Sequence, residues 1–485
     1  MKLKNCFNSE INKLKYIFSV LLLIFFYKVP PAFSQDKIDL KNADELSGKT
    51  IDGQDVREAD GNVEFSQGNV RVFCNSATQY LKSNRVELRG NVKIYQDTLT
   101  LLTSKANYFG DEKKAICEGG VTLKDPNATL RADNGVYSFS ETKAVFKGDV
   151  IIINPGYRIT SDELTYFRNS QNSLARGNVI IKTDSAEIKA DNVDFYRSEG
   201  KSFAFGNVRI ESDSTIITSD TSTNYSLEKK SVASGKVKIE NLSNNLLIYG
   251  NRLENYEREN VTFVYGNSKL IQSEKDKDTL YIYCDSMEAN RNKPEYFLAK
   301  GNVEIIRKDF LSKCGKAVYF RDEETVSLSR NPVVWQDRLQ MTGDSVFAEL
   351  SENKLTNIFV RKLSSANDSK TSFVISFNGD ENFKDRYDQI SGSDITLKFL
   401  NDKINLIEVE GNSNSIYFLY EKNKANGLNK IEGEKIFLYF DEEEKISRIK
   451  VDTDPKGEFV PESLLNTVNL TLAGFNLRED KPFRK

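Results

Sequence analysis

A glycine that recurs at a fixed step of 29 residues constrains the fold of this chain more than any other feature. The motif persists at a looser step around Gly266, Gly301 and Gly411. A constant step of this length indicates a repeat architecture, in which each unit packs on its neighbours rather than around one central core. Most members of the series open the triplet Gly-Asn-Val or a close variant, and they are Gly61, Gly90, Gly119, Gly148, Gly177, Gly206 and Gly235.

Apolar and polar residues alternate around each glycine. This period of two predicts a strand with one apolar face and one solvated face. Isoleucine or leucine occupies the fourth position after the glycine, as in Ile94, Leu123 and Ile152. Valine occupies the second position, at Val92, Val121, Val150, Val179, Val208 and Val237. A further apolar column in the second half of the unit holds Leu101, Leu130, Ile159, Ile188 and Ile217.

Short polar turns separate the two strands of each unit. Antiparallel neighbours can be joined by such short turns, whereas parallel strands need long crossovers, so the unit is predicted to be a β-hairpin. A glycine inside a strand usually marks a bulge or bend. If every strand bends at the same depth, the strands fold over into two facing layers. The fold class is therefore all-β, a repeat array of antiparallel hairpins whose apolar columns line a long trough or flattened barrel.

The regularity of the repeat predicts the domain organisation. Residues 35–363 are expected to form the main array. The connections lengthen afterwards, so residues 364–460 are expected to continue the fold with insertions or to form a second, smaller lobe. Residues 461–485 have no strand pattern and are expected to be a tail or cap over an open end.

The first 34 residues have the features of a secretory signal peptide. Lysines precede an apolar stretch from Tyr16 to Tyr27, and Ala32-Phe33-Ser34 forms a small-residue cleavage site. The alternative is a short N-terminal membrane anchor. The mature protein is expected outside the cytoplasm, in the periplasm. Four cysteines remain after the signal, and their positions in the repeat favour small buried residues over disulfides: Cys74, Cys117, Cys284 and Cys314.

Composition argues against several kinds of site. The chain has no histidine, which excludes Ser-His-Asp triads and histidine-based metal sites. Its 68 basic and 71 acidic residues are nearly balanced, so no nucleic-acid partner is expected. Asp162, Asp191 and their repeats are better explained by hydrogen bonds to the backbone at a bend than by calcium binding or glycoside cleavage. The asparagines after the glycines are expected to face outward at the bend, where asparagine tolerates unusual backbone angles.

The repeated A-x-G-N-V-x-I strands, the returning [AS]-D-x-x-x-Y strands and the signal peptide together resemble the OstA-like family. This family includes the periplasmic lipopolysaccharide-transport proteins LptA and LptC and the N-terminal domain of LptD. The chain is most similar to the longer OstA-like proteins of Bacteroidetes-type bacteria, over residues 40–480. The C-terminal segment beginning GEFVPESLLNTVNL is also similar to theirs.

The resemblance implies a β-jellyroll with an apolar groove that holds the acyl chains of lipopolysaccharide or a related lipid, with no catalytic role and no cofactor. It also implies separate partner chains, namely an inner-membrane lipopolysaccharide exporter and an outer-membrane LptD-type translocon, and possible association with the outer membrane. The Val column and the second apolar column would line the groove. The alternative is an extracellular structural or adhesive β-repeat protein with a closed core.

Overall fold

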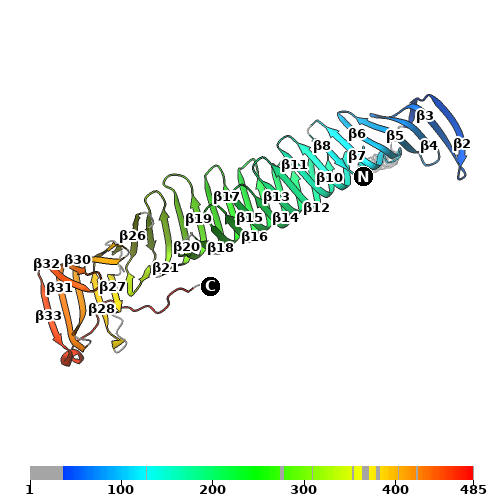
Figure 1. Ribbon diagram of the computed structural model, residues 1–485. Helices are drawn as coiled ribbons and strands as arrows, with labels where there is room; N and C mark the ends of the chain where they lie inside the picture. Colours follow the sequence, from blue (N-terminus) through cyan, green and yellow to red (C-terminus); the bar gives the residue numbers. More distant parts are fainter. Residues whose placement is uncertain are drawn as a thin grey trace, which may run out of the picture. The chain divides into compact units, whose positions relative to one another are not determined.

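The computed structural model describes residues 37–483, except 127, 274–277, 309, 352–353, 363–370, 378–382, 402 and 422–423. The predicted signal peptide and the predicted boundary at 363/364 lie outside the described residues. Within the described part the chain is almost entirely β-structure (Figure 1), and no helix there is long and apolar enough to cross a membrane. The all-β prediction is therefore confirmed.

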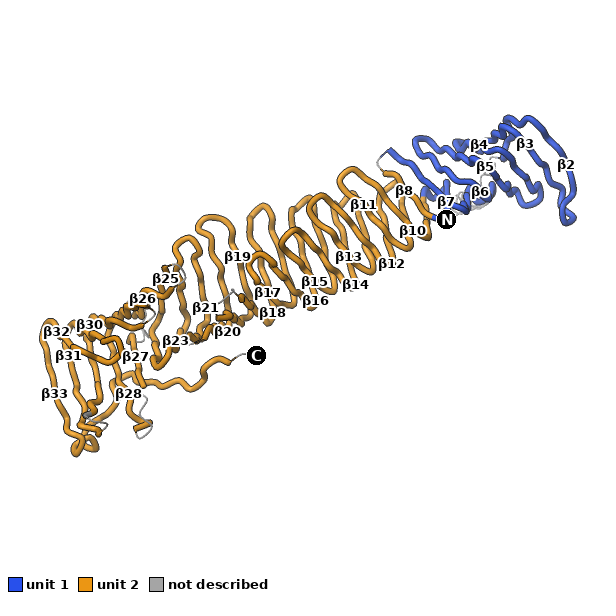
Figure 2. The backbone as a smooth tube through the Cα atoms, in the orientation of Figure 1, with its two compact units in different colours: residues 1–126, 133–142 blue, residues 127–132, 143–485 orange. Residues whose placement is uncertain are grey.

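The chain divides into two compact units, which are coloured separately in Figure 2. Unit 1 comprises residues 37–126 and 133–142 of the described part. Consecutive strands from β3 to β7 pair antiparallel, β1 and β2 both pair with β3, and β9 pairs with β7. The strands of unit 1 are β1 (Asp39–Asn42), β2 (Glu45–Ile51), β3 (Gln54–Gln67), β4 (Val70–Tyr80), β5 (Arg85–Gln96), β6 (Leu99–Phe109), β7 (Lys114–Asp125) and β9 (Asn134–Ser138).

Unit 2 begins with β8 (Ala128–Ala132) and continues from residue 143 onward. Its strands β10 to β21 follow one another as antiparallel hairpins, side by side in chain order (Figure 1). These strands are β10 (Lys143–Asn154), β11 (Tyr157–Phe167), β12 (Asn172–Thr183), β13 (Glu187–Tyr196), β14 (Lys201–Glu211), β15 (Thr215–Tyr225), β16 (Lys230–Asn241), β17 (Leu246–Tyr256), β18 (Val261–Gln272), β19 (Leu280–Asn290), β20 (Tyr296–Arg307) and β21 (Phe310–Phe320).

After β21 the two halves of each bent strand become separate strands. β22 pairs with β25 on one side of the bend, while β23 pairs with β24 on the other. The long strands β30 and β31 again extend across the bend and pair with each other on both sides of it. The bounds are β22 (Thr325–Ser329), β23 (Val333–Gln336), β24 (Leu339–Thr342), β25 (Ser345–Ser351), β26 (Lys354–Arg361), β27 (Ser372–Phe377), β28 (Tyr387–Gly392), β29 (Asp394–Leu400), β30 (Lys403–Glu421), β31 (Lys424–Phe440), β32 (Ile446–Asp452), β33 (Lys456–Pro461) and the 3-10 helix η2 (Glu462–Thr467).

The recurring glycine forms a bulge that bends each strand. Gly177 and Asn178 both have positive φ, at 72° and 47°, and the register of β12 against β13 shifts between Arg176 and Val179. The side-chain amide of Asn178 donates to Asp162 Oδ2 on the preceding strand at 2.9 Å. A Cβ added to Gly177 would lie 2.3 Å from that same oxygen. Glycine is therefore required both by its φ and by the aspartate packed over it.

These bulges test two of the sequence predictions. Asn62, Asn91, Asn207 and Asn302 share the positive φ, which confirms the unusual backbone angles expected for them. The aspartates differ from the prediction, because their donor is the side chain of the next asparagine. Asn207 Nδ2, for example, donates to Asp191 at 2.9 Å. Sequence spacing alone places the aspartate at the bend. It does not show which group on the neighbouring strand donates a hydrogen bond to the aspartate.

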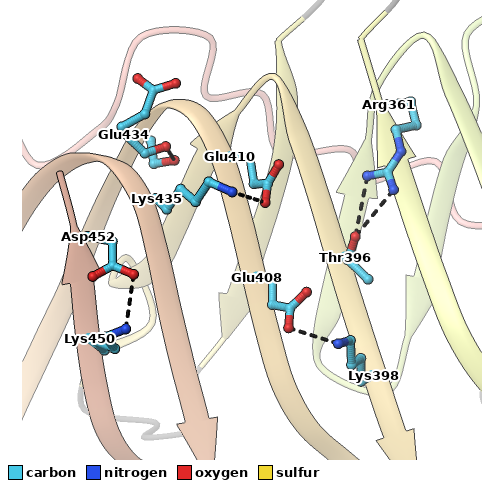
Figure 3. A network of polar contacts seen from close by, with 10 residues as sticks. Arg361, Thr396, Lys398, Glu408, Glu410, Glu434, Lys435, Lys450 and Asp452 are labelled. Atoms are coloured by element: carbon cyan, nitrogen blue, oxygen red, sulfur yellow. Dashed lines mark hydrogen bonds and ion pairs between the residues drawn. The ribbon is translucent and has the colours of Figure 1, made fainter.

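Charged side chains cover the outer face of the strands. In Figure 3, Lys398 donates to Glu408 at 2.8 Å, and Lys435 donates to Glu410 at 2.7 Å. Glu187 on β13 lies between Lys182 and Lys189, whose hydrogen bonds lower its pKa to about 2. Such exposed pairs each contribute little to stability, so the fold depends on its inner, apolar face.

The C-terminal tail covers an apolar part of the outer face. Gln389 on β28 donates to Leu470 O at 2.8 Å and accepts from Leu472 N at 2.8 Å. Gln340 on β24 makes the same pair of bonds with Asn476 O and Arg478 N, both at 2.8 Å. The side-chain amide of each glutamine therefore makes the paired N–H and C=O hydrogen bonds with the extended tail that the backbone of a neighbouring strand would make. Cys74, Cys117, Cys284 and Cys314 are free and buried, which confirms the expectation of small buried residues.

Candidate functional site

The eleven residues predicted to line the apolar interior lie on the same face of their strands, but at two depths. The valines lie beside the bend, each directly opposite a small residue. Val179 pairs with Ala190 and Val208 pairs with Ser219. All six valines are buried, with at most 3% of their surface exposed. They form the floor where the two arms of each bent strand meet.

Four of the five residues of the second predicted column, all except Leu101, belong to a continuous row of directly paired aliphatic residues, here called the aliphatic row. It crosses twelve consecutive strands of unit 2, because every register places its members opposite one another. The members are Leu130, Ile152, Ile159, Ile181, Ile188, Ile210, Ile217, Ile239, Ile248, Leu270, Ile282 and Ile305.

Burial changes along the aliphatic row. Ile159 is 8% exposed near one end, and Leu270 is 6% exposed near the other. Six consecutive members between them are only half-buried, and we call strands β12–β17 the open stretch. Of the predicted residues, Ile188 and Ile217 fall in it. Along these strands the apolar interior face is partly accessible to solvent, at Ile181, Ile188, Ile210, Ile217, Ile239 and Ile248.

Polar residues occupy the corresponding row on the other arm of β14–β18, of which β14–β17 belong to the open stretch. They too lie opposite one another across successive strands, and each is exposed or half-buried. Their side chains bond to one another: Ser231 donates to Asn224 at 3.1 Å, and Thr262 donates to Asn255 at 2.8 Å. The interior face of the open stretch is therefore amphipathic. This polar row consists of Ser202, Asn224, Ser231, Asn255 and Thr262.

The interior of unit 1 is filled by its own side chains. Tyr108 is fully buried, packs against Phe65 with the ring centroids 5.8 Å apart and the ring planes tilted by 60°, and donates its hydroxyl to Gln67 Oε1 at 2.6 Å. Gln67 in turn donates to Gly110 O at 2.8 Å. Burial raises the pKa of the Tyr108 phenol well above its usual range. These contacts join the two arms of the bent strands, so the predicted residues Val92, Leu101 and Val121 lie in a packed core there.

The polar row is the part of this arrangement that sequence reasoning missed. Its signal is present four residues before the recurring glycine. That column reads Val86, Ala115 and Ala144 in the earlier repeats and changes to serine at Ser173, Ser202 and Ser231. The change coincides with the passage from the closed to the open part of the interior, but a column of serines resembles the solvated face of any strand.

Two protein-family models match parts of this chain. A family model described as "OstA-like protein" matches residues 35–174. A second, described as "LptA/(LptD N-terminal domain) LPS transport protein", matches residues 158–354. The chain belongs to the OstA-like lipopolysaccharide-transport family. Its bent antiparallel strands accordingly form an LptA-like β-jellyroll.

Among solved structures, this OstA-like chain is similar to LptH of Pseudomonas aeruginosa, described as the LptA-homologous periplasmic component of the conserved lipopolysaccharide transport device. The identity is 16%, the match covers 30% of this chain and 82% of LptH, and the TM-score is 0.17. No curated protein matches the chain.

Proposed function

We propose that this OstA-like protein is a periplasmic component of lipopolysaccharide transport that holds the acyl chains of the lipid against the aliphatic row of the open stretch. The observation that carries the proposal is the run of six half-buried isoleucines between buried neighbours. Covering this surface with hydrocarbon would stabilise a complex by about 0.8 kcal/mol for each buried methylene. No reacting group is needed for such binding.

Membership of a lipopolysaccharide-transport family supports a proposal about partners. A chain that binds lipid only by apolar burial does not itself drive transport. We propose that an inner-membrane exporter supplies the lipid and an outer-membrane LptD-type translocon receives it, both as separate chains. Apolar burial involves no covalent bond, so a bound lipid can be released to the receiving chain.

Photo-crosslinking in cells tests the proposal. A photoreactive residue at Ile188 or Ile217 should form an adduct with lipopolysaccharide. The same residue at Thr218, which follows Ile217 and points to the opposite face, is the matched control. Adducts at the two isoleucines but not at Thr218 support lipid binding, whereas no adduct at any of them contradicts it.

A closed structural array remains the second candidate, because unit 1 has the packed interior expected of one. Crosslinking also separates the candidates. A probe at Leu101, which is 1% exposed, should capture no lipid on either account, whereas a probe at Ile217 should capture it only if the open stretch is a lipid site.

A further inference from the structure

Arg291 lies next to the polar row, immediately after β19. Its Nη2 donates to Asn255 Oδ1 at 3.1 Å and to Thr262 Oγ1 at 3.2 Å. Both acceptors belong to the polar row, and Thr262 pairs directly with Ala289 of β19. Arg291 also continues the alternation by which Met287 and Ala289 face inward. Arg291 is exposed, and its two bonds hold the guanidinium at the solvent-accessible edge of the interior face rather than on the outer face.

The charge of Arg291 is not compensated. Its two side-chain partners are neutral, and within the described part of the chain it forms no ion pair with a carboxylate. Several other arginines of unit 2 form ion pairs, as Arg321 does with Glu295 at 3.4 Å and Arg176 does with Asp194. A guanidinium has five N–H donors, so most of those of Arg291 remain available to a ligand.

Strand β17 carries one residue of the aliphatic row and one of the polar row, at a separation that a single amphiphilic molecule can span. Ile248 of the aliphatic row and Asn255 of the polar row lie seven residues apart on β17. Along an extended strand this corresponds to at most about 23 Å, and the bend between them shortens it. One amphiphilic molecule can therefore contact both rows at once.

We propose that Arg291, with Asn255 and Thr262, forms an anion subsite that binds the phosphate or carboxylate of an amphiphile whose hydrocarbon lies on the aliphatic row. The inference rests on the proposed lipid-binding function and adds to it the position and charge of the lipid's polar end. Arginine suits this task because its planar fork binds such anions through two parallel hydrogen bonds. The neutral oxygens of Asn255 and Thr262 orient the guanidinium without neutralising it.

Calorimetric titration of the mature chain tests the subsite with decyl phosphate, decanol and inorganic phosphate as probes. Decyl phosphate should bind more tightly than decanol. Arg291→Gln should weaken decyl phosphate by about tenfold or more, which is the usual worth of a hydrogen bond to a charged group, and leave decanol unchanged. Arg291→Lys should recover part of the loss. The control Arg258→Gln removes an exposed turn arginine that donates to Leu227 O at 2.9 Å, and it should change neither affinity.

Each outcome decides the question. If decanol and decyl phosphate bind equally, the anion subsite is wrong while lipid binding stands. If neither amphiphile binds, the proposed lipid-binding function fails as well. Equal binding of inorganic phosphate and decyl phosphate would indicate a site for the free anion and overturn the link to the aliphatic row. Thermal melting of Arg291→Gln should match the wild type, and a large drop in melting temperature would instead assign Arg291 a structural role.

Discussion

Two isoleucines of the aliphatic row offer a matched test of whether the interior is open or closed. Ile159 and Ile217 lie 58 residues apart, which is two repeats. Each is flanked by isoleucines on both sides, because Ile159 pairs with Ile152 and Ile181, and Ile217 pairs with Ile210 and Ile239. They differ only in burial. Replacing each by alanine therefore compares the same chemical change in two environments.

The expected losses follow from that difference. Ile159 is 8% exposed, so Ile159→Ala should cost about 3 kcal/mol, within the range for a buried isoleucine that leaves a cavity. Ile217 is half-buried, and part of its side chain is already solvated in the folded state. Ile217→Ala should therefore cost about 1 to 1.5 kcal/mol. Affinity for decyl phosphate should change in the opposite order, with a loss of about threefold to tenfold at Ile217 and little change at Ile159.

Native-state hydrogen exchange is the suitable assay, because a repeat array opens locally rather than all at once. The opening free energy of β11 reports on Ile159, and that of β15 reports on Ile217. Equal losses at the two positions would refute the reasoning, since they would mean that the interior is packed uniformly. Loss of probe binding in Ile159→Ala alone would place the lipid site elsewhere in the array.

Three further predictions concern the bend, a buried acid and the tail. Gly177→Ala should cost about 2–3 kcal/mol, from a strained φ and displacement of the aspartate packed over the glycine, measured as the loss in local opening free energy. Burial raises the pKa of Asp388 to about 7. Protonation of Asp388 therefore favours the folded state fully below about pH 4, and this contribution to stability is lost as the pH rises through 7. Asp388→Asn should flatten the corresponding fall in melting temperature, which reflects at most about 4 kcal/mol. Gln340→Ala should release the tail and shift the emission of Trp335, the sole tryptophan, to longer wavelength.

Each of these has a control. Gly156 also has positive φ, at 91°, but nothing lies within 4 Å of its added Cβ, so Gly156→Ala isolates the conformational cost and should be milder. A loss as large as that at Gly177 would contradict the role given to the aspartate. Asp385→Asn, at an exposed position, should leave the pH dependence unchanged. Deletion of residues 474–485 should reproduce the emission shift of Gln340→Ala, and an unchanged spectrum would show that the tail does not cover Trp335.

Much of the fold was predictable because its determinants are local. The glycine step, the alternation around Val179 and the short turns each depend on neighbouring residues, so the hairpins and their bends can be read from the chain. The placement of Gln340 and Gln389 was not predictable. Their partners lie 136 and 81 residues away, in a tail without strand periodicity. Nothing in the surrounding pattern distinguishes a glutamine that binds this tail from one that faces solvent.

The local sequence pattern is enough to specify an array of bent antiparallel hairpins with one apolar inner face, because a period of two and a bulge every 29 residues admit little else. Where that inner face is closed and where it is open depends instead on contacts between residues that are distant in the sequence. Closure depends on side chains that meet across the two arms, as Gln67 and Tyr108 do from positions 41 residues apart. In the open stretch Asn224 stands at the repeat position of Tyr108, and Ser202 and Ser231 stand at the position of Val86, so polar residues line this arm while the isoleucines of the aliphatic row are only half-buried.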